Sequence, residues 1–115
     1  MKIAISATDN TLDASVDSRF GRCAWFLVVD SETMEYEAIK NENADAASGA
    51  GTSCAQLVLE KGANTVISGR VGPNAHEVLE QGEATIFIAP QDSSVRETIQ
   101  KCVDNQLPQM KMKVF

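Results

Sequence analysis

A glycine-rich loop at Gly69–Asn74 holds the first residues whose types and spacing could do chemistry. It follows a short apolar run at Thr65–Ile67 and leads into a helical pattern. Asn74 can serve as N-cap there, and Glu77 three residues later completes a capping box. A strand, a glycine loop and a helix N-terminus in succession offer backbone N–H groups to an anion.

His76, the only histidine of the chain, falls in the first turn of that predicted helix. The helix dipole disfavours the charged imidazole at this end, so the neutral form is expected. A neutral imidazole can bind a metal or donate a hydrogen bond. A surface position without function explains His76 equally well.

A second glycine loop, Gly49–Gly51, also leads into a helical pattern. It lacks the third glycine of a dinucleotide-binding fingerprint, so alone it indicates only a flexible start to the helix. Three of the four arginines lie beside glycines in predicted loops, which favours a pocket for an anion. The candidate binding residues are Arg19, Arg22, Gly49, Gly51, Thr52, Arg70, Gly72, Asn74 and His76.

The three cysteines are widely spaced and form no Cys-x-x-Cys pair, which indicates neither a disulfide framework nor a zinc site. Cys54 is expected in the first turn of a helix, where the dipole lowers a thiol pKa. It could be a nucleophile or a soft-metal ligand, but a small core residue is the favoured interpretation. Cys102 is predicted to be structural, and the sequence does not decide which way Cys23 faces. Cys54 and His76 are thus the candidate metal ligands.

The length, charge and motif content of the chain argue against several classes of function. The 115 residues fit one domain, and a net charge of −6 argues against nucleic acid and anionic membranes as partners. There is no membrane-spanning run and no signal-peptide layout after Met1, so we expect a cytoplasmic protein. A single histidine and the absence of nucleophile-elbow or Walker motifs predict that the chain is not an enzyme.

The hydrophobic pattern predicts the element order β-β-β-α-β-α-β-α, an N-terminal hairpin followed by βαβ units in one mixed five-stranded α/β sheet flanked by helices. The predicted strands cover 1–7, 24–29, 34–40, 65–68 and 83–89. The predicted helices cover 52–61, 74–81 and a stretch capped by Asp92 or Ser93. We expect a domain over 1–107 and a tail over 108–115, with 106–115 frayed or loosely docked.

This connectivity places four long loops, 8–22, 41–51, 69–73 and 89–92, at one edge of the sheet. They include the glycines that flank arginines. Ligands of open α/β sheets bind outside the carboxyl ends of the strands, which is the same edge. Fold and composition therefore indicate one binding face.

Several motifs along this chain occur together in a known family. They are Arg19-Phe-Gly21-Arg22 before an apolar strand ending in Asp30, then Asn43, Gly49-x-Gly51, Ala55-Gln56, Gly62 and Gly69-Arg70-x-Gly72-Pro73-Asn74-Ala75. In this order and spacing the chain resembles the dinitrogenase iron–molybdenum cofactor biosynthesis family, which includes nitrogenase cofactor carriers and molybdenum–copper orange proteins. The pattern covers roughly residues 1–107. Ala44 replaces a proline that the family often has, and the metal-donating tail of some members is absent.

The resemblance implies a ribonuclease-H-like fold and non-covalent binding of an anionic metal–sulfur cluster, of molybdenum–iron or molybdenum–copper type, or its precursor. It implies no catalysis, and a cofactor-assembly or acceptor protein as partner. Two alternatives stand beside it. One is a small-anion or nucleotide-phosphate sensing module without metal. The other, a hydrolase on the same scaffold, needs clustered carboxylates, and Asp9 lacks partners at the neighbouring strand ends.

Overall fold

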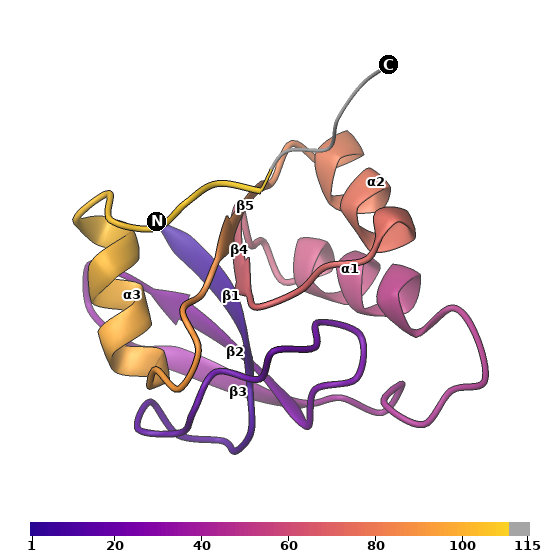
Figure 1. Cartoon of the computed structure of the whole chain (residues 1–115), viewed down its shortest axis with the longest axis horizontal. Coiled ribbons are helices and arrows are strands. Elements are labelled where there is room, and N and C mark those ends of the chain that lie inside the picture. The colour runs from indigo at the N-terminus through magenta and orange to yellow at the C-terminus, as the bar shows by residue number, and fades with distance from the viewer. Residues whose placement is uncertain (111–115) are drawn as a thin grey trace.

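A computed structural model describes residues 1–110 and shows one mixed sheet of five strands in the order β3-β2-β1-β4-β5 (Figure 1). The strands are β1 (Lys2–Ala7), β2 (Trp25–Asp30), β3 (Tyr36–Lys40), β4 (Thr65–Ser68) and β5 (Thr85–Ile88). The helices are α1 (Ala50–Glu60), α2 (Pro73–Gln81) and α3 (Val95–Val103). β2 runs antiparallel to β1 and β3, whereas β4 runs parallel to β1 and β5. The predicted fold class is therefore confirmed, and this strand order is that of a ribonuclease-H-like sheet.

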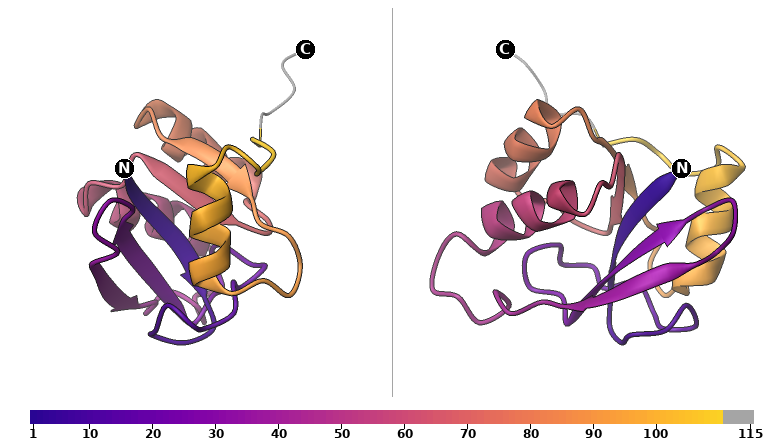
Figure 2. Two further views of the ribbon diagram at one scale, coloured as in Figure 1. Left: turned by 90° about the vertical axis from the view of Figure 1, so that its left-hand side faces the viewer. Right: turned by 180° about the vertical axis from the view of Figure 1, so that it is seen from behind.

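The helices cover both faces of the sheet, with α1 and α2 on one face and α3 on the other (Figure 2). Alternation along β1 supplies both cores: Ala4 faces α1 and α2, while Ile3 and Ile5 face α3. These side chains are fully buried, as expected for a central strand covered on both sides. The sheet and its helices thus form a three-layer α/β domain, and the long loops extend from one edge of it.

The strand directions bring the four long loops to one edge, as predicted. Backbone hydrogen bonds fasten them to one another: Phe20 N donates to Arg70 O at 3.1 Å, and Val16 N to Ser93 O at 2.9 Å. The segment 15–22 consequently runs across the carboxyl ends of β1 and β4. No helix within residues 1–110 is both long and apolar enough to cross a bilayer.

Two predicted helix N-caps were wrong. α2 begins at Pro73 with Gly72 as N-cap, so Asn74 lies inside the first turn and no side chain caps the helix. Proline is well suited to the first helical position because its missing N–H would have no partner there. α3 is capped by Ser94, whose side chain accepts a hydrogen bond from Glu97 N at 3.1 Å, and not by Asp92 or Ser93.

Residues 106–110 are docked more firmly than the sequence suggests. Ile88 N donates to Pro108 O and Met110 N to Ile86 O, both at 2.8 Å, so this segment lies along β5. Leu107 is buried in the core beneath α3. Of the two expectations for the tail, frayed or loosely docked, the frayed one was wrong for residues 106–110, and residues 111–115 lie outside the described residues.

Candidate functional site: a cleft between two helix N-termini

A cleft of about 210 Å³ opens where α1 and α2 begin. It is lined by Phe20, Gly21, Gly49, Gly51, Thr52, Gly72, Pro73, Asn74 and Ala75. Five of these are residues that the sequence proposed for binding, namely Gly49, Gly51, Thr52, Gly72 and Asn74. The structure thus brings both glycine loops to one place, although they are separated in sequence by α1 and β4.

Both helices start without a side-chain cap and without an acidic residue in the first turn. The N-caps are Gly49, in the left-handed region with φ 77°, and Gly72. The first bonds back to these caps come from Ser53 N and His76 N. The N–H groups that precede these two donors have no acceptor in the described part of the chain. Two partial positive charges consequently meet at the cleft, which suits an anion.

Small residues allow the walls of the cleft to approach closely. A Cβ atom on Gly21 would lie 3.0 Å from Gly51 N and 3.1 Å from Gly51 Cα. A Cβ on Gly51 would in turn lie 3.3 Å from Ala75 Cβ. The loop containing Gly21, the start of α1 and the start of α2 therefore pack backbone against backbone.

Gly69 is packed against Ser18 as closely as Gly21 is against Gly51, so a side chain at this position should lower stability. A Cβ there would lie 2.8 Å from Ser18 Cα, a backbone atom that cannot move alone. We expect Gly69→Ala to lower the free energy of unfolding by about 1–3 kcal/mol. Gly72→Ala is the matched control, because its Cβ would meet nothing within 4 Å. Denaturant unfolding of both variants would measure this, and equal stability would contradict the tight contact.

Arg22 is tied to the loop before α1 and does not line the cleft. Its guanidinium donates to Ala44 O at 2.8 Å and also to Ala46 O. Arg22 thus holds the loop that leads to Gly49, and its part in binding stays a prediction.

Arg19 and Arg70 lie on neighbouring segments joined by a parallel bridge. The Arg19 guanidinium pairs with Asp17, with Nε 3.3 Å from Oδ1, and borders a separate hollow of about 680 Å³. Arg70 is exposed and forms no salt bridge within the described residues. Arg70 does not line the cleft, although Gly72, two residues further on, does, so its part in binding stays a prediction.

His76 is buried, with 5% exposure, and does not line the cleft. The interpretation as a surface residue was therefore wrong. Its Nδ1 lies 3.4 Å from a carboxylate oxygen of the exposed Glu80, but neither ring nitrogen has a hydrogen-bond partner within residues 1–110. This separation is too long for a well-aligned hydrogen bond, so the contact is weak.

All three cysteines are free and buried. α1 begins at Ala50, so Cys54 lies in its second turn and not in the first as predicted. Burial raises the pKa of the Cys54 thiol to about 11, outweighing the Asn41 hydrogen bond and nearby Arg22, and Cys54 lies in the core, as the favoured interpretation had it. Burial likewise raises the pKa of Cys23 to about 12. No three His, Cys, Asp or Glu side chains gather as a metal site among the described residues.

Asn41 is a residue of this region that sequence reasoning missed. Its buried amide donates to Cys23 O at 2.8 Å and to Gly21 O at 3.2 Å. Its Oδ1 accepts from Asn43 N at 3.0 Å and lies 3.3 Å from Cys54 Sγ. One side chain thus joins the end of β3, the Gly21 loop and α1. The only signal in the sequence was an asparagine directly after a strand, where turn-forming residues are common.

The fold and the cleft define a small α/β domain that presents two uncapped helix N-termini at one edge of a ribonuclease-H-like sheet. The chain belongs to the dinitrogenase iron–molybdenum cofactor family, whose sequence pattern matches residues 1–105.

The chain is also similar to individual proteins. An uncharacterized protein of Methanocaldococcus jannaschii is 32% identical over 110 residues, covering 93% of this chain and 89% of the relative. The apo form of the orange protein from Desulfovibrio gigas superposes with a TM-score of 0.90 at 35% identity, over 95% of this chain and 92% of the other. A putative NifB protein from Thermotoga gives 0.84 at 26% identity, over 99% and 97%.

Proposed function

We propose that this protein binds an anionic metal–sulfur cluster, or its precursor, in the cleft between α1 and α2 and carries it without catalysing a reaction. The observation behind this is the pair of helices that open on one cleft with no side-chain cap and no acidic first turn. Helix N-termini of this kind bind anions. Family membership and the likeness to the orange protein support a metal cluster as the anion.

The donors at the cleft suit binding by hydrogen bonds and not by coordination. Thr52 contributes a hydroxyl and Asn74 an amide beside the backbone N–H groups, whereas Cys54 and His76 do not line it. Hydrogen bonds to the sulfur atoms of a cluster both hold it and tune it. Arg70 supplies long-range attraction in an otherwise acidic protein. A molybdenum–iron or molybdenum–copper cluster would reach this site from a cofactor-assembly protein or leave it for an acceptor.

A second candidate is the sensing of a compact anion without metal. The cleft of about 210 Å³ is small, and the described residues offer no group of three metal ligands. Both features suit a tetrahedral oxyanion or thioanion, or the phosphate of a nucleotide, as well as a cluster.

Reconstitution of the reduced protein with tetrathiomolybdate, with and without copper or iron, tests the proposal. After desalting, metal analysis and a visible spectrum should show retained metal with new charge-transfer bands. Arg70→Ala should weaken retention by about tenfold, since it removes a cation near Gly72 that forms no salt bridge within residues 1–110. Arg96→Ala is the control, because this arginine pairs with Asp13 on the α3 side.

Each result has a distinct meaning. A colourless, metal-free protein would favour the compact-anion function, which phosphate or molybdate binding by calorimetry would then test. Metal retention that is equal in both arginine variants would count against the cleft as the site.

A further inference from the structure

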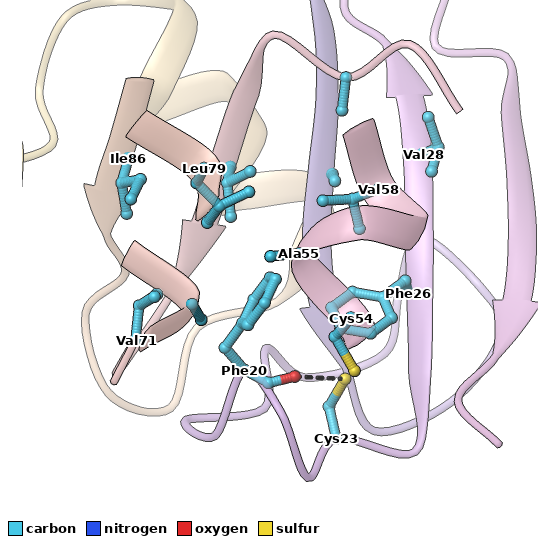
Figure 3. Close-up of a cluster of buried hydrophobic side chains, with 14 residues drawn as sticks. Phe20, Cys23, Phe26, Val28, Cys54, Ala55, Val58, Val71, Leu79 and Ile86 are labelled. Atoms are coloured by element: carbon cyan, nitrogen blue, oxygen red, sulfur yellow. Dashed lines mark hydrogen bonds between the residues drawn. The ribbon is translucent and has the colours of Figure 1, made fainter. Parts of the chain in front are cut away.

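The thiols of Cys23 and Cys54 are brought together beneath the cleft. Both residues are fully buried, and their side chains point toward one another in Figure 3. They share one amide: Cys54 Sγ lies 3.3 Å from Asn41 Oδ1, and Cys23 Sγ lies 3.9 Å from Asn41 Nδ2. Sequence reasoning weighed each cysteine alone and missed the pair, because 30 intervening residues separate them along the chain.

The two backbones that carry these cysteines are already in contact. The Gly21 position approaches Gly51 so closely that a Cβ would lie 3.0 Å from its nitrogen. Cys54 Sγ lies 3.7 Å from Gly21 O, and Cys23 Sγ lies 3.3 Å from Phe20 O. The segment 20–23 and the first two turns of α1 therefore run side by side. Both thiols therefore lie against the same short stretch of backbone, Phe20–Gly21.

We propose that Cys23 and Cys54 form a reversible dithiol–disulfide pair that reacts with low-molecular-weight disulfides. One protein thiolate attacks the small disulfide, forming a mixed disulfide and releasing one thiol. The second protein thiolate then attacks the mixed disulfide, forming the Cys23–Cys54 bond and releasing the second thiol. The protein loses two protons and two electrons, and the small disulfide gains both.

The cross-link would act on the cleft. Phe20 and Gly21 form one wall and the start of α1 forms another, so the disulfide would fasten the two walls together. The reaction should be slow at neutral pH, because attack requires an accessible thiolate, whereas both thiols are fully buried and burial also keeps them protonated. Its rate should rise about tenfold per pH unit while the thiolate fraction is small. This pair would respond to sustained oxidation and not to brief exposure.

Incubation of the full reduced chain with glutathione disulfide at pH 7 and pH 9 tests the proposal. Intact mass should show loss of two hydrogen atoms without a lasting glutathione adduct, and peptide mapping should join Cys23 to Cys54. Cys102→Ser is the matched control and should react alike, since Cys102 lies in the core on the opposite face of the sheet. Cys23→Ser should instead keep one glutathione on Cys54, and Cys54→Ser one on Cys23.

Several outcomes would overturn it. These are a wild-type protein that stays reduced while its urea-unfolded form reacts, a stable glutathione adduct on the wild type, or a cross-link that includes Cys102. Circular dichroism of the serine variants guards against misfolding, and the wild-type mass alone decides the question if one of them fails to fold.

Discussion

Asn74→Asp should stabilise the fold and weaken anion binding at the same time. Asn74 is exposed, lines the cleft and lies in the first turn of α2, which holds no acidic residue. A carboxylate there interacts favourably with the helix dipole, and we expect a gain of about 0.3–1 kcal/mol in the free energy of unfolding. The same charge would repel an anion bound a few ångströms away, lowering its affinity by at least about tenfold. Asparagine and aspartate have nearly the same shape, so the effect isolates charge.

Asn64→Asp is the matched control for this prediction. It makes the same change of charge at the opposite edge of the sheet, between α1 and β4. Its effect on anion affinity should be small, because charges farther apart than about 10 Å are screened at ordinary ionic strength. Binding of tetrathiomolybdate or molybdate and thermal unfolding would be measured for both variants. Unchanged affinity in Asn74→Asp would place the bound anion elsewhere.

The fold could be predicted from the sequence because its signals are local and consistent. The continuous apolar run from Trp25 to Val29 indicated a buried strand, and β2 is buried over most of its length. The hairpin and βαβ connections then determined the directions of all strands. Gly62, with φ 86°, ended the α1 region as expected of a residue after a helix.

Helix starts were less predictable, since several residues can cap the same helix. Asn74 had the better side chain, but Pro73 before it fits the first helical position, so the backbone of Gly72 became the cap. α1 likewise begins two residues earlier than predicted, at Ala50 and not at residue 52. Cys54 therefore lies in the second turn of α1 and not in the first. The helix dipole acts on a thiol in the first turn of a helix, whereas a thiol further along can be buried in the core. Burial therefore determines the pKa of Cys54.

The residues that line the cleft were predicted in part. Both glycine loops were recognised because glycine before a helix is visible in sequence. The partners of long side chains could not be predicted. Arg22 could reach several acceptors, and its hydrogen bonds to the Ala44 and Ala46 carbonyls depend on the conformation of the folded loop. Asn41 was missed for the same reason: all of its partners except Asn43 come from distant parts of the sequence.

Asn41→Ala should have the largest effect on stability. The substitution leaves the carbonyls of Gly21 and Cys23 and the N–H of Asn43 without their present partner. A buried polar group without a partner costs about 1–3 kcal/mol, so we expect a loss of roughly 3 kcal/mol in the free energy of unfolding. In a domain of this size the midpoint of thermal unfolding should fall by roughly 10 °C or more.

The side chain of Asn43 makes no hydrogen bond within residues 1–110, which makes Asn43→Ala the matched control. It should change stability by no more than about 0.5 kcal/mol. Amide hydrogen exchange would separate a local effect from a global one. In Asn41→Ala, protection should fall most in segment 20–23 and at the start of α1, because Asn41 joins these two walls of the cleft. Uniform loss of protection would show that Asn41 supports the whole domain and has no special part in shaping the site.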